Sequence, residues 1–271
     1  FMLNEEADKL ISLKSDINAL FNSPVLGYNS KDDIVYQFWA NRDSHEVYYF
    51  DPKTDYAPTT AISSISWDDP NFPNIEGFGV WAAKCNFTMG PDGKMYSRML
   101  GGNLVRIDVE NARGENLTNG DLVGTKDGSA YGLVFDPQDE NVFYFSNNDK
   151  HCIYKYDLRT KECACWAGQE GKSGYLDGPI GQAMFNKPGQ MCVDSEGNII
   201  LTDTENHCIR KITMSTGYVS TLAGKPQNSG YVNGSAEDAQ FKKPLGICID
   251  NDDVMYIGDS ENRAIRRLAV E

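Results

Sequence analysis

Residues 183–212 read AMFNKPGQMCVDSEGNIILTDTENHCIRKI, and residues 239–268 read AQFKKPLGICIDNDDVMYIGDSENRAIRRL. The two stretches align without a gap at an offset of 56 residues. Self-similarity at a fixed period of this length is typical of solenoids, propellers and other repeat architectures. The chain is therefore built from repeated units, and the structure of one unit decides the fold.

Each unit contains short β-rich runs separated by turns. In the copy that begins at residue 183 the runs are QMCVD, NIILTD, CIRKI and, further along, YVSTLAG. The segments between them are rich in Asp, Asn, Ser and Gly, which favour tight turns. Four short antiparallel strands in a unit of roughly 50 residues are typical of a β-propeller blade. A solenoid fits less well, because no helix is predicted within the unit.

Three weaker copies precede these two. The residue before the third strand marks every copy, and it falls at His45, Asn103, His151, His207 and Arg263. We therefore predict an all-β fold, a β-propeller of four-stranded antiparallel blades with five blades. Six blades are the alternative, if one copy has diverged beyond recognition.

One propeller domain is expected to occupy residues 1–271. The last copy stops after its third strand, so the repeat itself supplies no outer strand there. Residues 8–14, DKLISLK, alternate between apolar and polar, which indicates a strand. We predict that this segment supplies the missing strand and closes the ring. The alternative is that residues 1–16 are a linker from an upstream domain.

The composition is that of an acidic folded protein. Apolar residues make up 40% of the chain, and 39 Asp and Glu against 25 Lys and Arg give a formal net charge of −14. This charge argues against nucleic-acid partners and anionic membranes, which are bound through clustered Lys and Arg. No window approaches the roughly 18 consecutive apolar residues of a membrane span, so no membrane insertion is expected.

The three histidines, His45, His151 and His207, occupy the same position of the repeat. This position is two strand spacings from the inner strand, so equivalent turns in adjacent blades should be on the order of 10 Å apart. Zinc binds its nitrogen ligands at about 2.1 Å. We therefore predict no metal site, and expect these side chains to hydrogen-bond across the hairpin and against the next blade.

The acidic turn residues are assigned to the geometry of their own turns, because Asp side chains readily bond nearby backbone amides. They are Asp194, Asp250, Asp203 and Asp259. The seven cysteines contain no C-x-x-C pair, and the chain has no G-x-S-x-G, G-x-G-x-x-G or P-loop motif. No cofactor and no catalytic residue are predicted.

The long loops that join the fourth strand of one blade to the first of the next are the best candidates for ligand binding. Loops 67–81, 168–184 and 224–240 exceed the two to six residues of a simple connection. Their aromatic side chains can stack on sugars or peptides, while neighbouring polar groups fix the orientation. The predicted ligand-binding residues are Trp67, Phe72, Trp81, Tyr175 and Tyr231. Because Tyr175 and Tyr231 recur in the repeat, the alternative is that they only pack the loops.

The stretch from residue 183, followed by GYVSTLAG, resembles the NHL repeat, which is named for an Asn-His-Leu signature. Asn206, His207 and Cys208 stand at the signature here. The resemblance is close over residues 168–268 and loose over 17–110. It implies a propeller, with six blades in most family members.

The linker pattern A-G…G-Y-x-x-G…A-x-F-x-x-P resembles that of secreted bacterial members of this family. These often carry an upstream immunoglobulin-like TIG domain. The resemblance thus implies a location outside the cell, in the periplasm or on the cell surface, and an upstream domain absent from this chain.

The combined observations favour an extracellular or cell-surface binding propeller without catalytic activity. It is expected to be monomeric and to recognise a neutral glycan, a peptide, a protein or another small ligand on one loop face. The alternative is a hydrolase or lyase that uses the central channel. That reading ranks second because the predicted innermost strands, such as QMCVD and GICID, carry acids only at their ends and no histidine.

Overall fold

A computed structural model of the chain describes residues 2–3, 10–11, 25–29, 34–40, 45–51, 53, 58–62, 66–68, 88–98, 103–118 and 131–269. Side chains are described from residue 88 onward and at a few earlier positions. The statements below concern these residues.

The described residues form five large sheets, antiparallel except for one strand, and a short hairpin. The first sheet contains β3 (Val25–Asn29), β4 (Ile34–Ala40), β5 (His45–Phe50) and β6 (Pro58–Ile62). The second contains β8 (Thr88–Met89), β9 (Met95–Arg98), β10 (Leu104–Asp108), β11 (Arg113–Asn116) and, parallel to β11, β7 (Ser66–Trp67). The third contains β12 (Leu133–Phe135), β13 (Val142–Asn147), β14 (Cys152–Asp157) and β15 (Cys163–Gly168).

The last two sheets contain the two closely matched repeats. The fourth sheet contains β17 (Pro188–Val193), β18 (Ile199–Asp203), β19 (Cys208–Thr213), β20 (Tyr218–Ala223) and β16 (Gly178–Pro179), which pairs with β20. The fifth contains β21 (Pro244–Ile249), β22 (Met255–Asp259) and β23 (Ala264–Leu268). Single 3-10 turns, η3 (Thr204–Asn206) and η4 (Ser260–Asn262), connect the second strand to the third in these two sheets.

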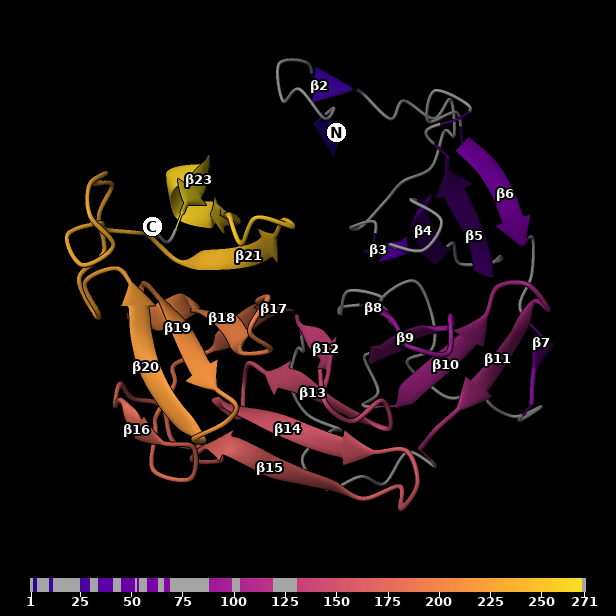
Figure 1. Ribbon diagram of the computed structural model, residues 1–271, viewed down its shortest axis with the longest axis horizontal. Coiled ribbons are helices and arrows are strands. Elements are labelled where there is room, and N and C mark those ends of the chain that lie inside the picture. Colours follow the sequence, from indigo (N-terminus) through magenta and orange to yellow (C-terminus); the bar gives the residue numbers. More distant parts are fainter. Residues whose placement is uncertain are drawn as a thin grey trace.

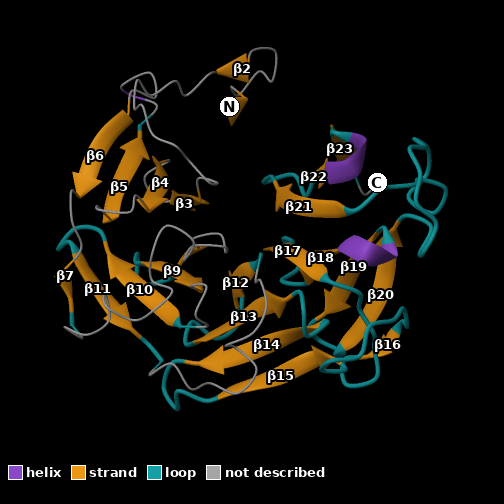
Figure 2. Cartoon of the chain, turned by 180° about the vertical axis from the view of Figure 1, so that it is seen from behind, coloured by secondary structure: helices purple, strands orange, loops and turns teal. Residues whose placement is uncertain are grey.

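The sheets follow one another around an arc, with the first and the fifth at its two ends (Figure 1). β3, β8, β12, β17 and β21 face the centre of the arc, and the later strands of each sheet lie farther out (Figure 2). This radial arrangement of antiparallel sheets is a β-propeller, as the repeat predicts.

The core lies between neighbouring sheets rather than within any one of them. Between the second and third sheets it includes Tyr96, Phe143 and Tyr156. Between the third and fourth it includes Val142, Ile199 and Leu201, and between the fourth and fifth Ile200, Ile209, Phe241, Ile247 and Ile257. Each sheet therefore depends on its neighbours for stability, which is the usual reason that blades occur in rings.

The predicted number of blades is wrong. Four sheets have the four or more strands of a complete blade, and the fifth has three, because no described strand pairs with the outer edge of β23. A sixth blade is not found in the described ranges either. In the repeat alignment β21, β22 and β23 correspond to β17, β18 and β19, the first three strands of the unit.

The segment predicted to close the ring is described only in part. Leu10 and Ile11 form β2 and pair with β1 (Met2–Leu3) in a two-stranded sheet. No described residue of this segment pairs with β23, so the closure of the ring by residues 8–14 stays a prediction.

Two glycines begin the loops that lead from the fourth strand of one blade to the next blade. Gly168 and Gly224 have φ of +95° and +100°, and a Cβ at either would lie 3.0 Å from the carbonyl oxygen of His151 or His207. A left-handed backbone and this close approach both require glycine. The Ala-Gly pair of the repeat thus fixes where each loop starts.

Candidate functional site

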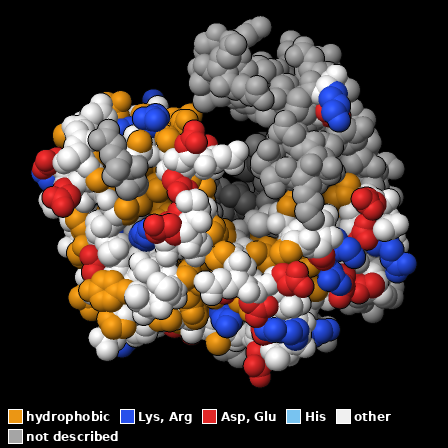
Figure 3. Space-filling view, viewed as in Figure 1, with side chains coloured by type: hydrophobic (Ala, Val, Ile, Leu, Met, Phe, Trp, Pro, Cys, Tyr) orange, Lys and Arg blue, Asp and Glu red, His pale blue; other side chains and the backbone are white. Residues whose placement is uncertain are grey.

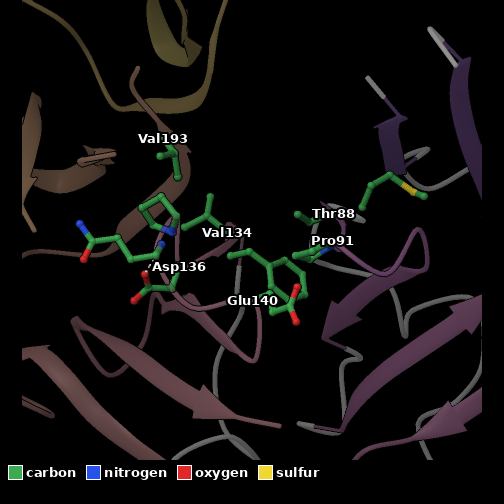
Figure 4. Close-up of a pocket in the computed structure, with 10 residues that line it drawn as sticks. Thr88, Pro91, Val134, Asp136, Glu140 and Val193 are labelled. Atoms are coloured by element: carbon green, nitrogen blue, oxygen red, sulfur yellow. Dashed lines mark hydrogen bonds between the residues drawn. The ribbon is translucent and has the colours of Figure 1, made fainter. Parts of the chain in front are cut away.

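A cavity of about 650 Å³ opens near the centre of the arc, beside the innermost strands (Figure 4). Its volume lies within the range of about 300–1,000 Å³ that is usual for small-molecule sites. The described residues that line it are Thr88, Met89, Pro91, Val134, Phe135, Asp136, Pro137, Gln138, Glu140 and Val193. They come from the second, third and fourth sheets, so the cavity forms only when these three sheets pack side by side.

The cavity lies at the end of the innermost strands where the chain turns into the second strand. Pro91 lies in the turn after β8, residues 136–140 follow β12, and Val193 is the last residue of β17. The long loops with Tyr175 and Tyr231 instead lead into β17 and β21 from the opposite end. The cavity and the predicted aromatic loops therefore lie at opposite ends of the innermost strands.

Most of the lining is apolar, and two carboxylates, Asp136 and Glu140, supply its charge. Among the described lining residues there is no Lys, Arg or His. Apolar side chains and carboxylates also lie close together on the face seen in Figure 3. Such a lining can hold an apolar group and orient it through a few polar contacts.

Asp136 is fixed by two hydrogen bonds. Its Oδ1 accepts the backbone N–H of Gln138 at 2.8 Å, and its Oδ2 accepts the hydroxyl of Tyr144 at 2.7 Å. Burial, together with Asp136, holds the pKa of Tyr144 well above its usual range. Tyr144 therefore stays protonated and acts as a donor, which keeps the carboxylate in place at the edge of the cavity.

The predicted ligand-binding residue Tyr175 packs against a buried arginine. The guanidinium carbon of Arg210 lies 4.9 Å from the ring centroid of Tyr175 and 5.1 Å from that of Phe185. The Tyr175 hydroxyl lies 2.8 Å from Oγ1 of Thr221. Tyr175 thus holds its own loop in place, and its role in ligand binding stays a prediction.

Tyr231 occupies the equivalent place in the next unit. Arg266 lies 5.0 Å from the ring centroids of both Tyr231 and Phe241. The Tyr231 side chain nevertheless remains 60% exposed, so one side of it is open to a ligand. Its role in binding stays a prediction.

The other predicted aromatic residues are described less fully. Trp67 lies on β7, at the outer edge of the second sheet, where its backbone pairs with Gly114. Phe72 and Trp81 lie outside the described residues. The described residues Trp67, Tyr175 and Tyr231 lie in three different places, on β7 and in the loops that lead into β17 and β21, with Trp67 on the strand farthest from the innermost strand of its sheet. Their role in ligand binding stays a prediction.

The sequence interpretation missed a buried ion pair in each of the two matched repeats. Nη1 of Arg210 donates to Oδ2 of Asp203 at 2.7 Å, and Nη1 of Arg266 donates to Oδ2 of Asp259 at 2.9 Å. Both carboxylates are fully buried. Each also accepts the side-chain amide of Asn206 or Asn262 in its own turn, and the backbone N–H of Asn186 or Lys242 from the loop before the first strand. The two carboxylates therefore bond beyond their own turns, which the sequence interpretation did not predict.

The arginines also hold the long loops. Arg210 donates to the carbonyl oxygens of Met184 and Leu176, at 3.1 and 2.9 Å. Arg266 donates to those of Gln240 and Val232, at 3.0 and 2.7 Å. Both ion pairs are therefore parts of the scaffold that orders the loops rather than parts of the cavity.

Two of the three histidines bond to the next blade, as predicted. Nδ1 of His151 accepts the backbone N–H of Lys187 at 3.1 Å, and Nδ1 of His207 accepts that of Lys243 at 3.2 Å. His45 is described only in its backbone, on β5. In the described part of the chain no group of three or more His, Cys, Asp and Glu side chains could hold a metal ion.

We expect His151 to make stability depend on pH. Burial and the charge of Lys187 lower the pKa of His151 below its ordinary value of 6.5, so the folded state binds fewer protons than the unfolded state. This stability is present above pH 6.5 and is lost as the pH falls below it. His151→Asn keeps an acceptor, tolerates the φ of 56° at this position and does not titrate. Its melting temperature should fall less than that of the wild type between pH 7.5 and 5.5, and equal slopes would contradict the assignment.

With the geometry established, comparison with known proteins identifies the repeat. Residues 185–212 match the NHL repeat. These residues lie within the stretch that predicts the fold, and residues 239–268 align to that stretch without a gap, so the NHL-type propeller is confirmed. An upstream TIG domain and secretion stay predictions.

The NHL-repeat chain has curated relatives that are much longer. It is 30% identical over 152 residues to NHL repeat-containing protein 2 of Gallus gallus, which covers 55% of the chain and 19% of that protein. It is 25% identical over 271 residues to Protein SUPPRESSOR OF QUENCHING 1, chloroplastic, of Arabidopsis thaliana, which covers 93% of the chain and 25% of that protein. The chain thus spans a quarter or less of these relatives.

Solved structures share the propeller of the NHL-repeat chain. A structural genomics protein of unknown function from Bacteroides thetaiotaomicron superposes with a TM-score of 0.76 at 24% identity, covering 91% of the chain and 58% of that protein. An auxiliary nutrient binding protein from the same organism superposes with a TM-score of 0.70 at 23% identity, covering 92% and 59%. At these identities the likeness shows the fold. No helix among the described residues of the chain is long and apolar enough to cross a membrane.

Proposed function

We propose that this propeller is a binding protein that holds a small ligand in the cavity beside its innermost strands. The observation that carries the proposal is the cavity itself, with about 650 Å³, an apolar lining and two carboxylates. A rigid ring that presents turns from several sheets around one hollow is a common way to build such a site. The auxiliary nutrient binding protein that shares the fold supports a binding role.

The proposal extends to the setting in which the protein acts. A location outside the cell or on its surface rests on the resemblance of the linkers to those of secreted bacterial NHL-repeat proteins. The absence of catalytic activity is part of the same proposal. The aromatic residue Tyr231, which is exposed at the other end of the ring, is the competing binding surface.

The test compares a variant that fills the cavity with a variant at the competing surface. Val193→Trp adds a bulky ring at a lining residue that is only partly buried, whereas Tyr231→Ala leaves the cavity untouched. Ligand-observed NMR with a library of small sugars, short peptides and other soluble compounds would identify compounds that bind the wild type.

We expect Val193→Trp to weaken these compounds roughly tenfold or more, because a ligand that loses its cavity loses most of its buried area. Tyr231→Ala should leave them unchanged. Both variants must melt cooperatively near the wild-type temperature. Loss of binding in Tyr231→Ala alone would place the site on the loops, and binding that neither variant alters would contradict the cavity as the site.

A further inference from the structure

We propose that the ligand of this cavity is a small organic cation, an ammonium or guanidinium group carried on an apolar body. This inference rests on the proposed function and names the chemical class of its ligand. The argument depends on which carboxylates near the cavity already have a partner and which do not.

The acidic residues in the turns around the cavity fall into two groups. Three that do not line the cavity have a cation beside them, whereas Asp253, which bonds to Ser195 in the turn after β17, forms no ion pair in the described part of the chain. Asp92 lies 3.7 Å from Arg106, Asp139 lies 2.7 Å from Arg159, and Asp194 lies 3.0 Å from Lys211, measured between charged nitrogen and oxygen atoms. Each of these cations also contacts a second carboxylate, Glu115, Asp157 or Glu196, so the ion pairs fix these turns but leave them with a net negative charge.

The two carboxylates that line the cavity have no such partner. In the described part of the chain neither Asp136 nor Glu140 forms an ion pair, and no basic residue stands among the described lining residues. The nearby guanidinium of Arg159 forms its ion pair with Asp139, one residue before Glu140, and not with Glu140. The negative charge that lines the cavity is thus left for a ligand to match.

Both carboxylates retain the capacity to accept hydrogen bonds from a ligand. An ionised carboxylate has about four acceptor positions. Asp136 uses one on each oxygen, for Gln138 and Tyr144, and these two bonds hold its position without neutralising it. Glu140 is exposed and forms no hydrogen bond with another described residue, so it can turn toward a bound donor.

The rest of the lining indicates that the cation carries an apolar body. Val134 and Phe135 are the last two residues of β12, and Val193 is the last residue of β17. All three line the same hollow as Met89 on β8. Burying apolar ligand surface there is favourable by roughly 25 cal/mol for each Å². A bare metal ion would gain nothing from these groups and would need several converging oxygen ligands.

The charge of the whole chain supports the same class of ligand. A formal net charge of −14 attracts cations and repels anions before contact, an effect that weakens as salt is added. A purely neutral ligand would leave the two unpaired carboxylates with no counter-charge. A cation with an apolar body satisfies the charge and the apolar lining together.

The test uses three probes of one shape and different charge: benzylamine, benzyl alcohol and benzoate. Their affinities for the wild type would be measured by saturation-transfer NMR at low salt. We expect benzylamine to bind about fivefold or more tightly than benzyl alcohol, since each exposed charge pair contributes up to about a fivefold effect. Benzoate should bind weakest, and the preference for the amine should shrink in 0.5 M NaCl, where the Debye length falls to roughly 4 Å.

Two variants in one turn distinguish a direct contact between Glu140 and the ligand from the effect of removing one negative charge nearby. Glu140→Gln should weaken benzylamine about threefold and leave benzyl alcohol unchanged. Asp139→Asn removes the same charge next to it, from a residue that already pairs with Arg159 and does not line the cavity, so its effect should be clearly smaller. Both positions are on the surface, and a melting curve verifies that each variant folds.

Equal affinity for the amine and the alcohol, or tighter binding of benzoate, would overturn the inference. If the probes bind with one of these patterns and Val193→Trp abolishes their binding, they bind in the cavity. The proposed function then stands although the inference fails. If the wild type binds none of the three probes, the inference is wrong, and the library screen decides the proposed function separately. An equal effect of Glu140→Gln and Asp139→Asn would also contradict a direct contact.

Discussion

Asp203→Asn is expected to destabilise the propeller by about 3 kcal/mol, because it removes the fully buried one of the two carboxylates that face Arg210. The buried guanidinium then keeps only Asp177 as a counter-charge in the described part of the chain, at 2.6 Å and 34% exposed. The side chains of Asp203 and Arg210 are both fully buried, and their charged atoms lie 2.7 Å apart. Burial raises the pKa of Asp203 to about 6, against the lowering effects of Arg210, Asn206 and the Asn186 N–H. The guanidinium of Arg210 at 2.7 Å favours the ionised form of the carboxyl.

The loss should appear as a melting temperature lower by roughly 10 °C, since each kcal/mol shifts a domain of this size by about 2–4 °C. Asp238→Asn is the matched control, because it breaks an exposed pair with Lys225 and should leave the melting temperature nearly unchanged. Arg210 also holds the Leu176 and Met184 carbonyls, so faster proteolysis of the long loop should accompany the loss. Similar melting of the two variants would show that the buried pair does not stabilise the fold.

The repeat predicts the strands of the last two sheets because period-2 alternation and turn residues depend only on neighbouring residues. The runs QMCVD, NIILTD, CIRKI and YVSTLAG correspond to β17, β18, β19 and β20. The role of His151 and His207 is also predictable, since a position that recurs in every unit has a recurring environment. The NHL resemblance follows from the same stretch.

The two Asp–Arg pairs could have been predicted from the sequence. Asp203 is the last residue of β18 and pairs with Cys208, which places Arg210 on the same face of β19, two residues further along. The same spacing recurs at Asp259 and Arg266. A buried pair could thus have been inferred from two charges that repeat together on one face.

The cavity could not be predicted in this way. Its lining comes from three sheets, from Thr88 to Val193, and these residues meet only because the sheets are arranged radially. Nothing in the local pattern of Val134 or Glu140 distinguishes a residue that lines the cavity from any other strand end or turn. The ligand site was predicted on the aromatic loops because their residue types can be read from the sequence. The packing of Tyr175 on Arg210 cannot be read from it.

Ile209 and Ile265 occupy the same position of the repeat, and we expect their truncations to differ widely. Ile209 is fully buried between the fourth and fifth sheets, in a cluster with Ile200, Phe241 and Ile257. Ile265 is 76% exposed, because the face of the fifth sheet on which it lies has no described neighbour. Ile209→Ala should therefore cost about 2–5 kcal/mol, and Ile265→Ala about 0.5 kcal/mol or less.

Chemical denaturation of both variants beside the wild type measures this difference directly, and the slopes of the transitions verify that each variant unfolds in the same way. The comparison is well matched, since residue type, strand and repeat position are the same and only the neighbouring sheet differs. A cost for Ile265→Ala as large as that for Ile209→Ala would contradict the exposure of this face. It would mean that another part of the chain, or a second molecule, covers the fifth sheet in solution and closes the ring there.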